Sequence, residues 1–167
     1  MKRKNKGFTL SELLIVVTII AVLVAISIPI FSKQLEKSRR AVDISTARSL
    51  KSAMTLALNQ GDLKITDDTT EIVLHVSRSE IDGGVYGEQA HVFIDGVGYQ
   101  GYKTMWTLFS KYGISDQITM KQKDKAIEWY AVSINGKGEC YYYEGKGNMN
   151  KYTDPSVAKK YEWSELE

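Results

Sequence analysis

The sequence has a single cysteine, Cys140, and only 2 prolines in 167 residues. One cysteine cannot form an intrachain disulfide, so packing and hydrogen bonds must hold the fold, and a disulfide scaffold is excluded. The hydrophobic share of 43% and the charged share of 25% exclude a disordered or a collagen-like chain. These values are typical of one globular domain with at most an appendage.

The chain also lacks a lasting excess of positive charge. Its 22 basic and 20 acidic residues give a net charge of +2, and four of the basic residues, Lys2, Arg3, Lys4 and Lys6, lie within the first seven positions. Without that segment, 18 basic residues face 20 acidic ones, a net charge of −2. Binding to nucleic acid needs clustered Lys and Arg, so no specific nucleic-acid partner is predicted.

Glycine is nearly absent from the first third of the chain. Of 13 glycines only Gly7 precedes Gly61, and residues 8–60 contain one proline, Pro29. This composition predicts one helix over residues 8–59, roughly 78 Å long, which is too long for a small domain to cover. The other glycines are mixed with β-branched and aromatic residues, as turns between short strands require. The predicted domain boundary therefore lies near Gly61.

The predicted helix changes character along its length. Residues 13–32 form a charge-free run of 20 residues, long enough to cross a bilayer. After residue 33, apolar residues recur at spacings of three and four among basic ones, at Ala47, Leu50, Met54, Ala57 and Leu58. This second half is amphipathic and is predicted to lie on a folded domain.

The fold class predicted for the chain is α+β, a long amino-terminal helix packed on an antiparallel β-sheet head. Strands are expected over residues 71–76 and 91–94, and a helical segment over residues 104–112. A hairpin is expected within residues 126–144, because Asn135-Gly136 accepts the positive φ angles of a tight turn. Asp154-Pro155 could start a short final helix.

The first 32 residues allow three interpretations. A cleaved secretory signal would use the basic start and a small-residue cut near Ala25 to Ser27, but the apolar run is longer than usual. A plain single-pass anchor gives Glu12 no purpose, although its carboxylate near the apolar run costs about 2–3 kcal/mol unless it is paired or near the headgroups. In the third interpretation, the segment is processed and then serves in an assembly.

The motif that favours the third interpretation spans residues 6–13, which read Lys-Gly-Phe-Thr-Leu-Ser-Glu-Leu. It resembles the prepilin signal of type IV pilins and pseudopilins, and departs from the commonest form only at Ser11, where Ile or Val is usual. Pro29 lies where many pilins carry a helix-bending proline. The resemblance covers residues 1–60, while the head is similar only in architecture. The usual pair of cysteines is absent, as in pilins of Gram-positive bacteria.

This resemblance implies a division of labour along the chain. Residues 1–7 would be a basic leader that prepilin peptidase removes by cutting between Gly7 and Phe8, and the new amine of Phe8 would be methylated. Residues 8–32 would form a transmembrane and filament-core helix, residues 33–60 its amphipathic continuation, and residues 61–167 the head. Glu12 would pair with the amine of a neighbouring subunit, and Pro29 would kink the helix.

The function implied is structural. The chain would polymerise with itself through its amino-terminal helix, with the peptidase, an assembly ATPase and a membrane platform protein as partners. The precursor would span the cytoplasmic membrane with its basic leader inside, and the extracellular pilus would serve adhesion, motility, aggregation or biofilm formation. The alternatives are a pseudopilin of a type II secretion or DNA-uptake system and a membrane-anchored binding domain.

Other motifs give weaker signals. Gly96–Gly101 matches the dinucleotide fingerprint, but too little chain follows it for a doubly wound domain. His75, His91 and Cys140 are the best metal ligands, and no two have a recognised spacing. No nucleophile pairs with a base and an orienting acid, so no enzyme activity, cofactor or metal is predicted. The tyrosines of residues 141–143 should alternate between the two faces of a strand.

Overall fold

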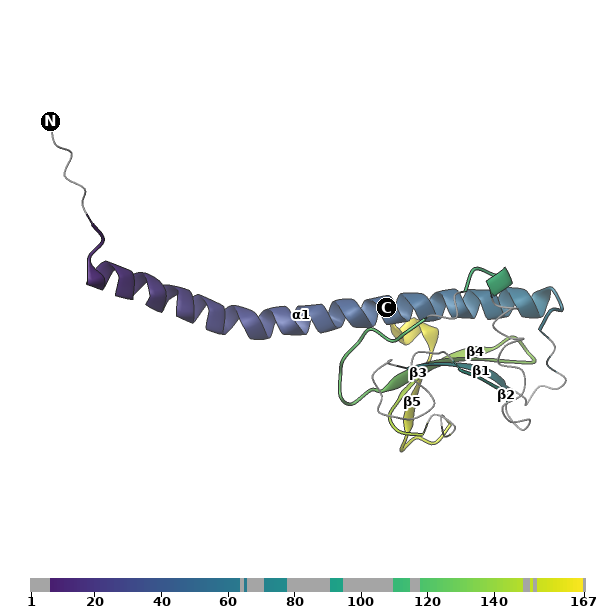
Figure 1. Ribbon diagram of the computed structural model, residues 1–167. Coiled ribbons are helices and arrows are strands. Elements are labelled where there is room, and N and C mark those ends of the chain that lie inside the picture. The colour runs from purple at the N-terminus through teal and green to yellow at the C-terminus, as the bar shows by residue number, and fades with distance from the viewer. Residues whose placement is uncertain are drawn as a thin grey trace. The chain divides into compact units, whose positions relative to one another are not determined.

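The computed structural model of the chain describes residues 7–63, 65, 71–77, 91–94, 110–114, 118–148, 151 and 153–166. Its elements are helix α1 (Leu10–Asn59), strands β1 (Glu71–Ser77), β2 (His91–Ile94), β3 (Trp129–Asn135), β4 (Cys140–Gly145) and β5 (Ala158–Tyr161), and a short 3₁₀-helix, η2 (Trp163–Leu166) (Figure 1). The chain divides into two compact units, one ending at Ser38 and the other beginning at Arg39. Helix α1 contributes to both, and the predicted α+β fold class is confirmed.

The first unit holds the apolar part of α1. The helix is continuous from Leu10 to Asn59, which confirms the long helix, and it is apolar and long enough to cross a membrane by length and composition. Most of the large apolar side chains between Phe8 and Phe31 are exposed. Pro29 lies inside the helix and has no N–H group to donate to the carbonyl four residues earlier. The kink expected at Pro29 stays a prediction.

Hydroxyl groups within this apolar part are satisfied by the helix itself. The hydroxyls of Thr18, Ser27 and Ser32 donate to the carbonyl oxygens four residues earlier, at 2.7, 2.7 and 3.0 Å. A polar side chain that bonds its own backbone in this way can enter an apolar environment at low cost. The segment is therefore suited to lipid or to a bundle of apolar helices.

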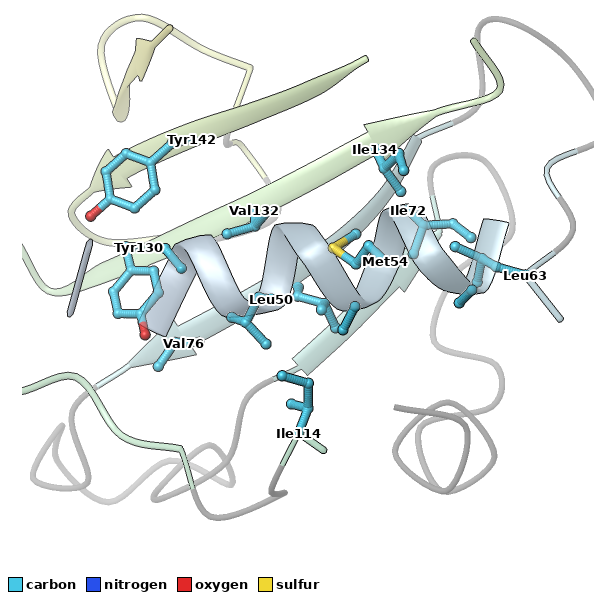
Figure 2. Packing of buried hydrophobic residues seen from close by; sticks show 14 of the residues in the cluster. Leu50, Met54, Leu63, Ile72, Val76, Ile114, Tyr130, Val132, Ile134 and Tyr142 are labelled. Carbon is cyan, nitrogen blue, oxygen red and sulfur yellow. The ribbon is translucent and has the colours of Figure 1, made fainter. Parts of the chain in front are cut away.

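The second unit packs the remainder of α1 against one face of the sheet (Figure 1). The predicted apolar stripe is confirmed, because its members are buried and only Leu58 is partly exposed. In Figure 2, Leu50 and Met54 of α1 lie among strand residues that point toward the helix. The strand residues of this cluster are Ile72, Leu74, Val76, Tyr130, Val132, Ile134 and Tyr142.

The strands form one antiparallel sheet in the order β2-β1-β3-β4-β5. The strands expected over residues 71–76 and 91–94 and the hairpin within residues 126–144 are confirmed. The tyrosines alternate as predicted, with Tyr142 facing α1 and Tyr143 on the opposite face, where it joins a second buried cluster. Both faces of the central strands are therefore buried.

The turn of the β3–β4 hairpin differs from the tight two-residue turn that was predicted. The positive φ angle falls on Gly138, at 81°, and not on Gly136. The side-chain oxygen of Asn135 accepts hydrogen bonds from the N–H groups of Lys137 and Glu139, at 3.1 and 2.9 Å. These bonds stabilise a longer loop that ends with a glycine in the left-handed region, a common alternative hairpin geometry.

The short helix predicted to start at Asp154-Pro155 is wrong. The Asp154 carboxylate instead accepts from the N–H and the hydroxyl of Ser156, at 2.9 and 2.7 Å, and closes a turn that leads into β5. A short helix comes later, as η2. Of the helical segment expected over residues 104–112, the structure describes only the end, where Ser110 and Lys111 are helical.

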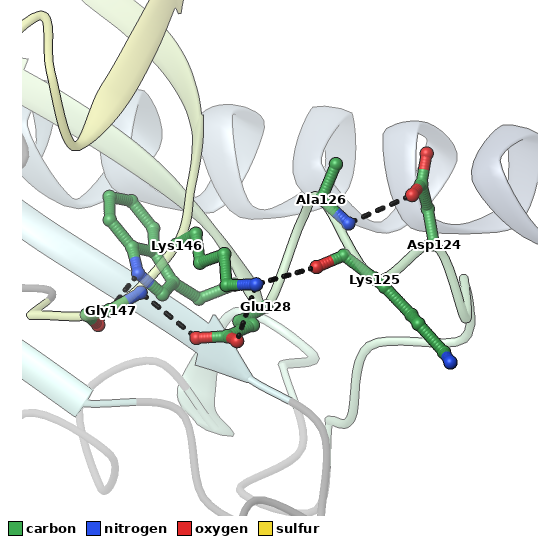
Figure 3. A network of polar contacts seen from close by, with 7 residues as sticks. Asp124, Lys125, Ala126, Glu128, Lys146 and Gly147 are labelled. Carbon is green, nitrogen blue, oxygen red and sulfur yellow. Dashed lines mark hydrogen bonds and ion pairs between the residues drawn. The ribbon is translucent and has the colours of Figure 1, made fainter.

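A polar network closes the other end of the β3–β4 hairpin (Figure 3). The ammonium of Lys146 donates to the carbonyl oxygen of Lys125 at 3.2 Å and lies 3.6 Å from Oε1 of Glu128. Oε2 of Glu128 accepts from the N–H of Gly147 at 2.9 Å, and the carbonyl of Gly147 accepts from the indole of Trp129 at 3.1 Å. The segment before β3 is thereby fastened to the segment after β4.

Candidate functional site

Helix α1 begins at a capping box formed by Thr9 and Glu12. The N–H and the hydroxyl of Thr9 donate to Oε2 of Glu12, at 2.8 and 2.7 Å, and the N–H of Glu12 donates back to Oγ1 of Thr9 at 3.3 Å. Each residue thus satisfies a donor at the helix start that has no partner within the helix. Our sequence-based predictions did not include this box, although Thr-x-x-Glu before an apolar run is its usual signal.

Ser11 joins this box through its side chain. Its Oγ lies 3.3 Å from Oγ1 of Thr9. The residue that departs from the common prepilin pattern therefore contacts the group that holds Glu12. The motif residues are brought together at the start of the helix, with Glu12 exposed.

Gly7 and Phe8 lie just before the helix and are both exposed. A Cβ atom added to Gly7 would meet no atom within 4 Å, and the backbone of Gly7 is outside the left-handed region that favours glycine. Phe8 is 82% exposed. The bond between them is accessible, and nothing in the described chain requires a glycine at this position.

Of the residues considered for metal binding, the structure describes the side chains of His75, on β1, and Cys140, on β4. His75 is buried beside Trp129, with the ring centroids 5.5 Å apart, and its Cα pairs in register with that of His91. Cys140 lies on β4, and burial raises the pKa of its thiol, the reverse of what a reactive thiolate needs. Among the described residues, no three or more His, Cys, Asp or Glu side chains are grouped to hold a metal ion. Gly96–Gly101 lies outside the described residues.

Two buried carboxylates that the sequence did not predict fasten α1 to the head. Both oxygens of Asp43 accept backbone N–H groups, those of Lys121 and Gln122, at 2.7 and 2.8 Å. Glu144 on β4 accepts two hydrogen bonds from the guanidinium of Arg40, at 3.2 and 2.9 Å. These contacts hold α1 against the sheet close to Arg39, where the second unit of the chain begins.

Comparisons with known proteins bear on the amino-terminal part. Residues 2–28 match the family described as the prokaryotic N-terminal methylation motif. A type IV major fimbrial protein FimA of Dichelobacter nodosus is 41% identical over 70 residues, which are 42% of this chain and 44% of that protein. A second FimA and a fimbrial protein of the same species are each 42% identical over 67 residues, 40% of this chain and 42% of those proteins.

The similarity to these relatives is partial. The chain matches less than half of the length of the fimbrial proteins, and no solved structure matches it significantly. Within that extent, the resemblance to type IV pilins that the sequence indicated is confirmed.

Proposed function

We propose that this chain is the precursor of a structural subunit of a type IV pilus and polymerises through the amino-terminal part of α1. The observation that carries the proposal is a capped, membrane-length apolar helix whose side chains are exposed and whose start bears one carboxylate, Glu12. Such a surface must be covered by lipid or by other apolar helices. The helix start lies within the methylation motif, and this part of the chain is similar to fimbrial proteins. Both findings favour the second possibility, in which helices of further copies of this chain cover the surface.

In this proposal, prepilin peptidase cuts between Gly7 and Phe8, and the new amine of Phe8 is methylated. Because a Cβ atom added at Gly7 would meet no atom of the described residues within 4 Å, the proposal assigns the requirement for glycine there to the peptidase. Before the cut, the basic leader keeps the amino terminus on the cytoplasmic side of the membrane, and the head lies on the outer side. Residues 1–7 are then lost, and residues 8–32 enter the filament core.

Assembly adds a second requirement, which Glu12 meets. The mature chain starts with a cationic amine, and pairing with the Glu12 carboxylate of a neighbouring copy would neutralise both charges among apolar helices. Residues 33–60 form the amphipathic continuation of the helix, and residues 61–167 form the head. The family resemblance adds an assembly ATPase and a membrane platform protein as partners. The role of the chain is structural, in a surface filament for adhesion, motility, aggregation or biofilm formation.

The test is the intact mass and the amino-terminal sequence of the chain in filaments sheared from the cell surface. We expect a polymer whose subunit begins at Phe8 and carries one extra methyl group. Gly7→Leu should block the cut without disturbing the fold, and Gly7→Ala serves as the matched control with a small side chain. A chain that stays in the membrane with residues 1–7 attached would overturn the proposal.

Glu12 is tested separately, in cells whose only copy carries the substitution. Glu12→Ala should be cut normally and yet give few filaments, and Glu12→Gln, which keeps the shape without the charge, should behave in the same way. Normal filaments from either variant would show that the carboxylate has no role in assembly. Processed chain without long surface filaments, even in the native sequence, would favour a pseudopilin instead.

A further inference from the structure

We propose that Thr9 and Ser11 are positioning residues that hold the Glu12 carboxylate by one oxygen and leave its other oxygen open for the amine of a neighbouring copy. This inference rests on the proposed function and deepens it. It assigns a purpose to Ser11, which the resemblance to pilins leaves unexplained.

The first observation is how the bonds divide between the two carboxylate oxygens. Both hydrogen bonds from Thr9, through its N–H and its hydroxyl, fall on Oε2 of Glu12. No described residue donates to Oε1, and the side chain is exposed. A carboxylate has about four lone-pair sites, so capping the helix leaves room for a further donor. Glu12 can therefore cap its own helix and bind a neighbour at the same time.

The second observation is the full use of the Thr9 hydroxyl. This group has one proton and two lone pairs. Its proton goes to Oε2 of Glu12, and it accepts from the N–H of Glu12, so the contact with Ser11 must have Ser11 as the donor. The resulting chain of bonds runs from the Ser11 hydroxyl through Thr9 to the carboxylate. An apolar residue at position 11 would remove its first donor.

These bonds prepare the carboxylate for its partner. Fixing the side chain before docking removes part of the loss of rotamer freedom that pairing would otherwise cost. The partner carries two N–H groups when the amine is singly methylated, and it remains cationic. One of them can donate to Oε1, so the carboxylate enters the apolar bundle with both oxygens bonded.

Processing leaves this arrangement intact. Both donors belong to Thr9, which follows the bond between Gly7 and Phe8, and Ser11 lies further along the helix. The carboxylate is thus held in the same way in the precursor and in the mature chain. The positioning therefore needs no rearrangement after the cut.

The test compares variants that keep or remove a hydroxyl group at positions 9 and 11. Thr9→Val removes it, Thr9→Ser keeps it, and Ser11→Ala removes the donor to Thr9. Each is produced as the only copy of the chain, and the ratio of filament to membrane subunit is measured on processed chain. Ordering a free side chain on docking weakens an association constant roughly two- to tenfold, so we expect that ratio to fall by about that factor for Thr9→Val. Ser11→Ala should lower it less, and Thr9→Ser should stay near the native value.

A second readout reports on the carboxylate directly. With ¹³C placed in the side chain of Glu12 in the full chain in detergent, the carboxylate resonance should move in Thr9→Val and return in Thr9→Ser. Native filament ratios in both Thr9→Val and Ser11→Ala would overturn the inference, and so would equal loss in Thr9→Val and Thr9→Ser. If Glu12→Ala also forms normal filaments, the assembly role of Glu12 fails as well, which separates the two outcomes.

Discussion

Replacing Arg40 tests how the head holds α1. Both oxygens of Glu144 accept from the guanidinium of Arg40, and Oε1 also accepts from the hydroxyl of Tyr142 at 3.0 Å. The side chain of Glu144 is 2% exposed and that of Arg40 is 42% exposed. Arg40→Met would therefore leave a buried carboxylate with one of its three donors.

The exposed fraction of Arg40 determines how far the Arg40→Met substitution should lower the free energy of unfolding. Breaking a fully buried ion pair from one side costs about 3–5 kcal/mol, because the remaining charge stays desolvated. Water reaches this guanidinium, so the loss is smaller, and we expect Arg40→Met to lower the free energy of unfolding by about 2–3 kcal/mol. Removing both charges, in Arg40→Met with Glu144→Leu, should restore most of that loss, since no buried charge is then left alone.

The assay is urea unfolding of the full chain in detergent, followed by tryptophan fluorescence, to which the buried Trp129 contributes, for the native chain, both single variants and the double variant. We expect a coupling free energy of at least about 1.5 kcal/mol between the two sites. Single effects that simply add, or a loss below about 0.5 kcal/mol for Arg40→Met, would refute the argument that the pair holds the helix to the sheet.

Three further predictions concern the head. In Gly145→Ala, the new Cβ would overlap the indole ring of Trp129, so the free energy of unfolding should fall by about 3 kcal/mol in the same urea assay. Asp43→Ala leaves two backbone N–H groups without their acceptor, and thermal unfolding should show a loss of about 3 kcal/mol. The hydrogen bond from Lys111 lowers the pKa of Asp62 below its usual value, so the contribution of this contact is present above about pH 4 and lost as the pH falls through the folded pKa. Hydrogen exchange of residues 110–112 should rise over that acid range in the native chain, and Asp62→Asn should abolish the dependence.

Local patterns in the sequence predicted the elements that depend on local geometry. The apolar stripe of α1, the alternating strands and the hairpin each follow from a repeat of 3.6 or 2 residues, which the sequence displays directly. The two errors have different causes. Asp154 has a side chain suited to a helix start, but the following residues pair with β4 and become β5. The turn after Asn135 is lengthened because the side-chain oxygen of Asn135 accepts hydrogen bonds from the N–H groups of Lys137 and Glu139.

The polar contacts of the head could not be predicted in this way. The partners of Asp43 lie 78 and 79 residues further along the chain, and Arg40 and Glu144 are 104 residues apart. A periodic pattern places charged residues on the solvent side of a helix, so it gives no sign that Asp43 or Arg40 contacts the head. Only the folded chain shows that their positions coincide with donors or acceptors from the sheet and its loops.

The carboxylates that bear on α1 differ in how much of their bonding capacity the chain itself uses. Both oxygens of Asp43 and both oxygens of Glu144 accept bonds within the second unit, whereas Glu12 is bonded by described residues through Oε2 alone. A carboxylate that is already bonded at both oxygens gains little from a new partner, while one with an open oxygen gains a charge-assisted bond. Substitutions at Asp43 and Glu144 should therefore change the stability of the head, and substitutions at Glu12 should leave that stability unchanged and act on assembly. The separation of these two effects follows from the bonding of each oxygen and not from the type of residue.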